Sequence, residues 1–65
     1  MVMKVKVVPN SEWENIYSQV GLENYIQIKE CSIRSIKKEG IVYISEYERD
    51  YLQSMGKHLT KDELL

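Results

Sequence analysis

Apolar and polar residues alternate at the start of the chain, which predicts a β-strand over residues 2–8. Every second residue is apolar and the residues between are lysines: Met3, Val5 and Val7 alternate with Lys4 and Lys6. A period of two is typical of a strand with one buried face. Proline cannot donate a ladder hydrogen bond, so Pro9 ends this strand.

The apolar spacing then changes to that of a helix. Four apolar residues follow the i, i+3, i+4, i+7 pattern of one helix face: Trp13, Ile16, Tyr17 and Val20. Ser11 and Glu14 have the spacing of a capping box. Gly21 suits the left-handed residue that often closes a helix. We therefore predict a helix over residues 12–20.

The middle of the chain returns to a strand pattern. Ile26 and Ile28 alternate with polar residues, and the alternation resumes at Ile33 and Ile36 in a different phase. A change of phase within a strand predicts a bend or bulge, here near Cys31.

A hairpin and a second helix are predicted next. Residues 38–40, Lys-Glu-Gly, form the clearest turn signal in the chain, because glycine tolerates a positive φ. Residues 41–44 follow as an apolar strand. Ser45 and Glu48 repeat the capping pattern, and an apolar stripe continues to Met55, which predicts a helix over 46–55. The segment after it is expected to form only a turn or a frayed helix.

Together these elements predict a single α+β domain over residues 1–65. Its sheet is expected to have three or four mainly antiparallel strands, accompanied by two short helices. The alternative is an SH3-like small β-barrel, in which residues 9–24 would form a long first loop.

Size and aromatic content predict contacts with other macromolecules. The chain has 65 residues, of which 43% are hydrophobic, including one Trp and five Tyr. A domain this small buries only about 60% of its unfolded surface, so some rings must stay exposed. Tyr and Arg are frequent at interface hot spots. We therefore predict partner-binding residues at Tyr43, Tyr47, Arg49 and Tyr51, another protein as the partner, and a homo-oligomer, most simply a dimer.

Basic residues on the predicted strands give an alternative partner. Lys29, Arg34, Lys37 and Lys38 could bind nucleic acid together with stacked tyrosines. The isoelectric point of about 5.8 favours a protein partner, because nucleic-acid-binding domains usually exceed about 9.

Catalytic, metal and cofactor chemistry is not expected. Cys31 is the sole cysteine and His58 the sole histidine, and neither belongs to a spacing motif. The three glycines stand far apart, so they form no phosphate-binding loop. No apolar run is long enough to span a membrane and no secretory signal is recognisable. We expect a cytoplasmic protein that is not an enzyme.

The composition carries a resemblance to one class of proteins. The chain lacks Ala and is rich in Lys, Ile, Glu and Tyr, which resembles coding from AT-rich genomes such as those of low-GC bacteria, their phages or some archaea. Small phage-type host-interaction proteins are similar in size and composition. The strand at 3–8, the turn at Gly40 and the ending at 58–64 also resemble an SH3-like barrel. The resemblance implies a module that docks on a host replication or transcription protein and modulates or inhibits it.

Overall fold

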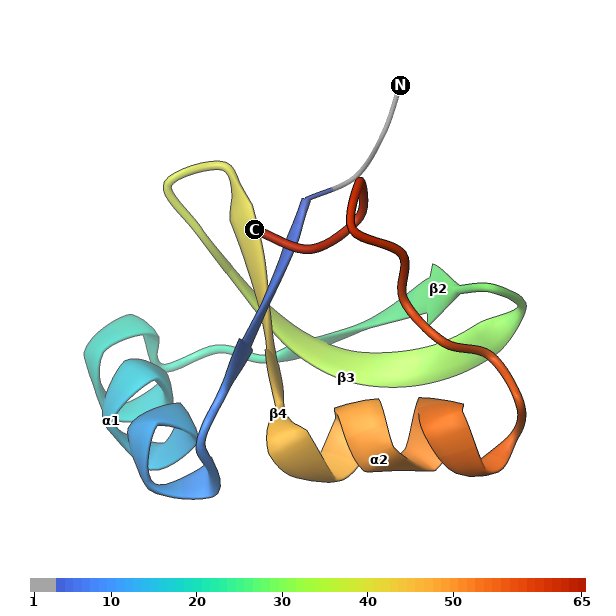
Figure 1. The fold of residues 1–65 in the computed structure, drawn as a ribbon. Helices are drawn as coiled ribbons and strands as arrows, with labels where there is room; N and C mark the ends of the chain where they lie inside the picture. The colour runs from blue at the N-terminus through green and yellow to red at the C-terminus, as the bar shows by residue number, and fades with distance from the viewer. Residues whose placement is uncertain (1–3) are drawn as a thin grey trace.

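The computed structural model describes residues 4–65, which form a four-stranded sheet and two helices (Figure 1). The elements in chain order are β1 (Val5–Val8), α1 (Asn10–Val20), β2 (Asn24–Ile28), β3 (Cys31–Lys38), β4 (Ile41–Ser45) and α2 (Glu46–Ser54). The predicted α+β class is confirmed. Residues 2 and 3 of the predicted first strand, Met3 among them, lie outside the described residues.

The sheet is open and mixed. Its strand order is β1-β4-β3-β2, with antiparallel pairing of β4 with β3 and of β3 with β2. β1 and β4 are parallel, with Val5 beside Val42 and Val8 beside Ser45. The alternative of an SH3-like barrel is wrong, because a barrel needs its edge strands to pair and here β1 and β2 lie at opposite ends of the sheet.

Two tight turns connect the antiparallel strands. The predicted hairpin is confirmed, with Glu39 at φ 54° and Gly40 at φ 78°. The second turn was not predicted: Lys29 and Glu30, at φ 50° and 70°, join β2 to β3. The expected bend or bulge near Cys31 is therefore wrong. The change of phase marks a reversal of the chain, and the β2–β3 ladder has no extra residue.

The start of α1 differs from the prediction and its end agrees with it. α1 begins at Asn10 with Pro9 as the capping residue, and no side chain donates or accepts at this cap. The Trp13 N–H donates to the Pro9 carbonyl at 3.0 Å, so the first turn closes before Ser11 can act as a cap. Gly21 has φ 71° and ends the helix in the left-handed conformation, as predicted.

The second helix and the chain after it agree with the sequence patterns. The Ser45 hydroxyl accepts from the Glu48 N–H at 3.4 Å, which confirms the predicted cap of α2. Near the end, the Glu63 carboxylate accepts from the Thr60 N–H at 2.9 Å and holds a turn. One feature was not predicted: Leu64 pairs with Val5 in parallel and extends the sheet beyond β1.

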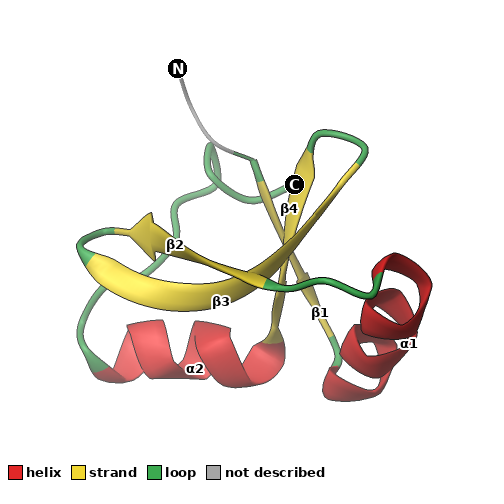
Figure 2. Cartoon of the chain, turned by 180° about the vertical axis from the view of Figure 1, so that it is seen from behind, coloured by secondary structure: helices red, strands yellow, loops and turns green. Residues whose placement is uncertain are grey.

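The core consists of two clusters on opposite faces of the sheet, since successive strand side chains alternate in direction. The larger cluster joins Leu52 of α2 to apolar residues of all four strands: Val5, Ile28, Cys31, Ile33, Val42 and Ile44. The smaller one joins Trp13 of α1 to Val8 and Ile36. In both views α2 lies along β3, whereas α1 lies near the C-terminal end of β1 (Figures 1 and 2).

Candidate protein-binding surface

α2 and the residue that ends it, Met55, carry three large side chains in a row that remain exposed. Tyr47, Tyr51 and Met55, which we call the tyrosine ridge, have exposed fractions of 69%, 44% and 54%. They are spaced four residues apart, so they lie side by side along the helix. Leu52, the buried residue of α2, points into the core and is fully inaccessible. The sheet therefore anchors α2 by one flank and leaves the ridge in solvent.

The ridge begins where the two helices start. The Tyr47 N–H donates to the Asn10 side-chain oxygen at 3.4 Å, which ties the first turn of α2 to the first turn of α1. Acidic residues surround this point, with Glu46 and Glu48 in the first turn of α2. Acidic side chains are favourable at a helix N-terminus because they oppose the positive end of the helix dipole.

Arg49 lies away from the ridge although it is close in sequence. Two residues along a helix correspond to about 200° of rotation, so Arg49 points away from both tyrosines. Its guanidinium lies 3.8 Å from the Glu46 carboxylate and 3.1 Å from that of Asp50. Arg49 instead lines a depression of about 270 Å³ together with Val7, Gln53, Leu59, Leu64 and Leu65.

Tyr43 is also separate from the ridge. It lies in β4, is half-buried, and packs against the cluster formed by Val8, Trp13 and Ile36. This is the sheet face opposite the one that holds Leu52. Of the four residues predicted to bind a partner, the structure places only Tyr47 and Tyr51 on one surface. Met55 joins them, and its four-residue spacing from Tyr51 was the signal in the sequence.

Arg34, predicted as part of a basic surface, links several elements within the molecule. Its Nε lies 3.7 Å from the Glu23 carboxylate and 3.8 Å from that of Glu48. Its guanidinium carbon lies 6.0 Å from the centre of the Trp13 ring. These contacts join β3 to both helices and to the segment before β2. The carboxylates of Glu23 and Glu48 offset the positive charge of the Arg34 guanidinium.

The other predicted basic residues do not form a continuous surface with Arg34. Lys29 lies at the turn before β3, and Lys38 lies at the far end of that strand, where its ammonium donates to Gln19 of α1 at 2.9 Å. Lys37 is exposed, and the strand alternation directs it to the opposite face from Lys38. The structure therefore distributes the four cations over two faces and both ends of β3.

Lys29 forms the closest ion pair of this set. Its ammonium lies 3.1 Å from the Glu63 carboxylate. A hydrogen bond from the Thr60 backbone N–H, and then the bond with Lys29, hold the pKa of Glu63 below its ordinary value. Lys29 thus fixes the C-terminal turn.

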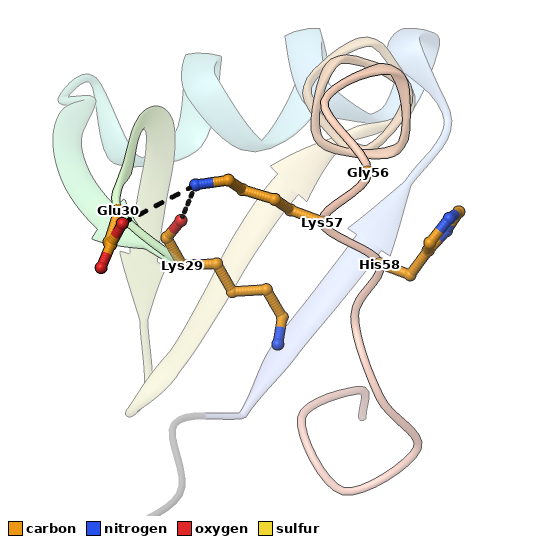
Figure 3. Close-up of a pocket in the computed structure, with 5 residues that line it drawn as sticks. All are labelled: Lys29, Glu30, Gly56, Lys57 and His58. Atoms are coloured by element: carbon orange, nitrogen blue, oxygen red, sulfur yellow. Dashed lines mark hydrogen bonds and ion pairs between the residues drawn. The ribbon is translucent and has the colours of Figure 1, made fainter.

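A shallow depression lies between the β2–β3 turn and the end of α2 (Figure 3). The Lys57 ammonium donates to the Lys29 carbonyl at 2.8 Å and lies 4.0 Å from the Glu30 carboxylate. His58 points away from these groups (Figure 3). A lysine already bonded to backbone and a histidine directed elsewhere provide no convergent acid, base or nucleophile.

No group of three potential ligands capable of holding a metal ion is present among residues 4–65. Cys31 is buried in the larger core cluster and packs as an apolar side chain. Neither helix of the described chain is long and apolar enough to cross a membrane. Comparison with protein-family models, curated proteins and solved structures finds no match to this chain.

Proposed function

We propose that this chain is a non-catalytic protein-binding module and that the tyrosine ridge of α2 is its contact surface. The observation that carries the proposal is the exposure of Tyr47, Tyr51 and Met55 in one row along α2 and its C-terminal end, while buried Leu52 anchors the helix to the core. Tyrosine dominates interface hot spots because it buries a large rigid ring and retains a polar tip. Methionine adapts its shape to a partner.

The charge on α2 indicates the chemistry of the partner. α2 contains Glu46, Glu48 and Asp50 against the single cation Arg49. Because Glu48 is paired with Arg34 of β3, an excess of one negative charge remains. A matching surface would offer an apolar groove for the rings and basic residues around it. Opposite charges at the rim of an interface accelerate association and exclude partners of like charge.

A host replication or transcription protein is the specific partner that we propose. Such proteins present basic surfaces to nucleic-acid phosphates, and an acidic helix with exposed rings is complementary to a basic surface. Occupying that surface would modulate or inhibit the host protein. The small size of the chain and its alanine-free composition support an origin in a phage or mobile element of a low-GC host.

The test is capture of partners on the immobilised chain from a lysate of a low-GC bacterium. The unaltered chain is compared with the Tyr47→Ala/Tyr51→Ala double variant. The matched control is Gln53→Ala, which removes an exposed side chain from the other flank of α2. Circular dichroism confirms that the variants are folded. Loss of a hot-spot ring costs about 2 kcal/mol of binding free energy, so the removal of each ring should weaken binding about thirtyfold.

The expected result is a set of proteins retained by the unaltered chain and by Gln53→Ala but lost with the double variant. A set that the double variant also retains would refute the ridge as the contact surface. Nuclease treatment of the lysate separates the alternative function. If nuclease abolished every interaction and binding weakened steeply with salt, the chain would be a nucleic-acid-binding protein.

A further inference from the structure

The two edges of the sheet differ in how they are covered. On the outer side of β1, the Val5 N–H donates to the Glu63 carbonyl at 2.8 Å and the Val5 carbonyl accepts from the Leu65 N–H at 2.8 Å. β2 forms the other edge and pairs only with β3 among residues 4–65. One edge is therefore closed by the chain itself, and the other is free.

The free edge also lacks the features that usually prevent edge pairing. β2 reads Asn-Tyr-Ile-Gln-Ile, without charge, proline or glycine. All five of its residues are in register with β3, so no bulge twists the edge away. Natural proteins commonly protect an exposed edge with lysine, proline or a bulge. An uncharged, regular and uncovered edge is suited to pairing with another strand.

The β2–β3 turn determines which backbone groups face outward. A two-residue turn at Lys29 and Glu30 makes Ile28 and Cys31 a hydrogen-bonded pair. Hydrogen-bonded and non-hydrogen-bonded pairs alternate along an antiparallel ladder. Ile26 and Ile28 therefore bond to β3, whereas the N–H and carbonyl groups of Tyr25 and Gln27 point to the free edge.

We propose that two copies of this chain pair through β2 in antiparallel orientation, with Ile26 on the two-fold axis. In this register Tyr25 of each copy lies opposite Gln27 of the other. All the outward groups of Tyr25 and Gln27 are then hydrogen-bonded across the interface. The same patch serves both copies, as a two-fold interface requires. The result is a continuous sheet of eight strands.

Side chains and charges support the same register. Ile26 is half-buried against the larger core cluster, so the two copies of Ile26 extend that cluster across the axis. Tyr25 is 69% exposed and gains a neighbour in Gln27 of the second copy. Just beyond the strand ends, Glu23 lies opposite Lys29 of the second copy, and the reciprocal pair lies at the other end. To pair across the axis, Glu23 exchanges Arg34, and Lys29 exchanges Glu63, for the residue of the second copy. A two-residue shift of register would bring no opposite charges together.

The charges provide a test that separates pairing from folding. Glu23→Lys and Lys29→Glu are prepared separately, and each is examined alone and in an equimolar mixture by sedimentation equilibrium. In a dimer of either variant alone, both pairs between residues 23 and 29 of the two copies carry like charges. In the mixed dimer both pairs are of opposite sign. Each variant also loses a contact within the chain, with Arg34 or Glu63, but mixing two folded chains cannot restore those contacts.

We expect the unaltered chain to form dimers within the concentration range up to about 1 mM, as a small edge interface is weak. Each variant alone should dimerise about tenfold more weakly, and the mixture should recover the affinity. A monomeric unaltered chain at about 1 mM, or a mixture no tighter than its components, would overturn the proposal.

A backbone variant gives an independent readout. Gln27→Pro removes an N–H that points outward and leaves the β2–β3 bonds intact, so it should abolish dimers while the fold persists. Gln27→Ala keeps that N–H and should still dimerise. Dimers that survive the proline would contradict pairing through β2. Because β2 and the tyrosine ridge are separate surfaces, Gln27→Pro should not alter ridge-dependent capture, and the two proposals fail separately.

Discussion

Leu52→Ala should destabilise this protein more than any other truncation in α2. Leu52 is fully inaccessible and is the buried residue of that helix. Its side chain packs in the cluster that contains Ile33 and Ile44. The helix is otherwise attached through its cap at Ser45 and through exposed or half-buried polar contacts. Burial of one leucine therefore holds the tyrosine ridge in position.

The expected loss is large relative to the total stability. Replacing a fully buried leucine by alanine costs about 3–5 kcal/mol, through lost transfer free energy and the cavity that remains. Domains are stabilised by about 0.05–0.15 kcal/mol per residue, which gives about 3–10 kcal/mol for a chain of this length. With a urea m-value near 1 kcal/mol/M, the midpoint should fall by about 3 M or more.

The loss of unfolding free energy in Leu52→Ala is measured by urea unfolding, followed by far-ultraviolet circular dichroism and by Trp13 fluorescence. Trp13 lies in the other cluster, so coincident transitions would show that both clusters unfold as one unit. Met55→Ala is the control on the exposed side and should change stability by less than about 0.5 kcal/mol. If Leu52→Ala cost less than about 1 kcal/mol, burial of this residue would not be what anchors α2.

Three further changes test local features of the fold. Glu30→Gly should raise the free energy of unfolding by about 1 kcal/mol, since Glu30 holds a φ of 70° that glycine adopts without strain; a lower urea midpoint would contradict this. Ser45→Ala should lower the melting temperature by removing about 1 kcal/mol of capping, whereas Ser54→Ala should leave it nearly unchanged. Because the folded pKa of Glu63 is lowered, its stabilisation is present above the unfolded pKa of about 4.3 and is lost as pH falls through the folded pKa. Glu63→Gln should therefore reduce stability near neutral pH and have little effect in strong acid; an equal loss in urea unfolding at both pH values would count against the Thr60 and Lys29 contacts.

Local sequence patterns were sufficient to predict turns and helix ends wherever one residue type determined the backbone conformation. Gly40 and Gly21 were correctly assigned to a turn and a helix end because both require a positive φ. Lys29 and Glu30 adopt the same unusual conformation, but neither residue type signals it. The turn between β2 and β3 could therefore not be recognised, and its effect on the alternation was misread as a bulge near Cys31.

Long-range pairing could not be predicted from periodicity. The alternation at Val5 and Val7 indicated a strand but not its parallel partner, because the same pattern fits either direction. For the candidate site, the apolar stripe of α2 includes both the buried Leu52 and the exposed Tyr51, so periodicity could not show which flank faces the sheet. That choice separates Arg49 from Tyr47 and Tyr51, which had been grouped by proximity along the chain.

The parallel pairing of β1 has a consequence for how the protein is made. Val5 is held by Val42 on one side and by Leu64 on the other, so β1 has no partner during synthesis until β4 and then Leu64 have also been made. The β2–β3–β4 segment, built from short-range turns, can assemble earlier. During that interval Val5, Val7 and Val8 are available to chaperones, and the nascent chain is most vulnerable to aggregation.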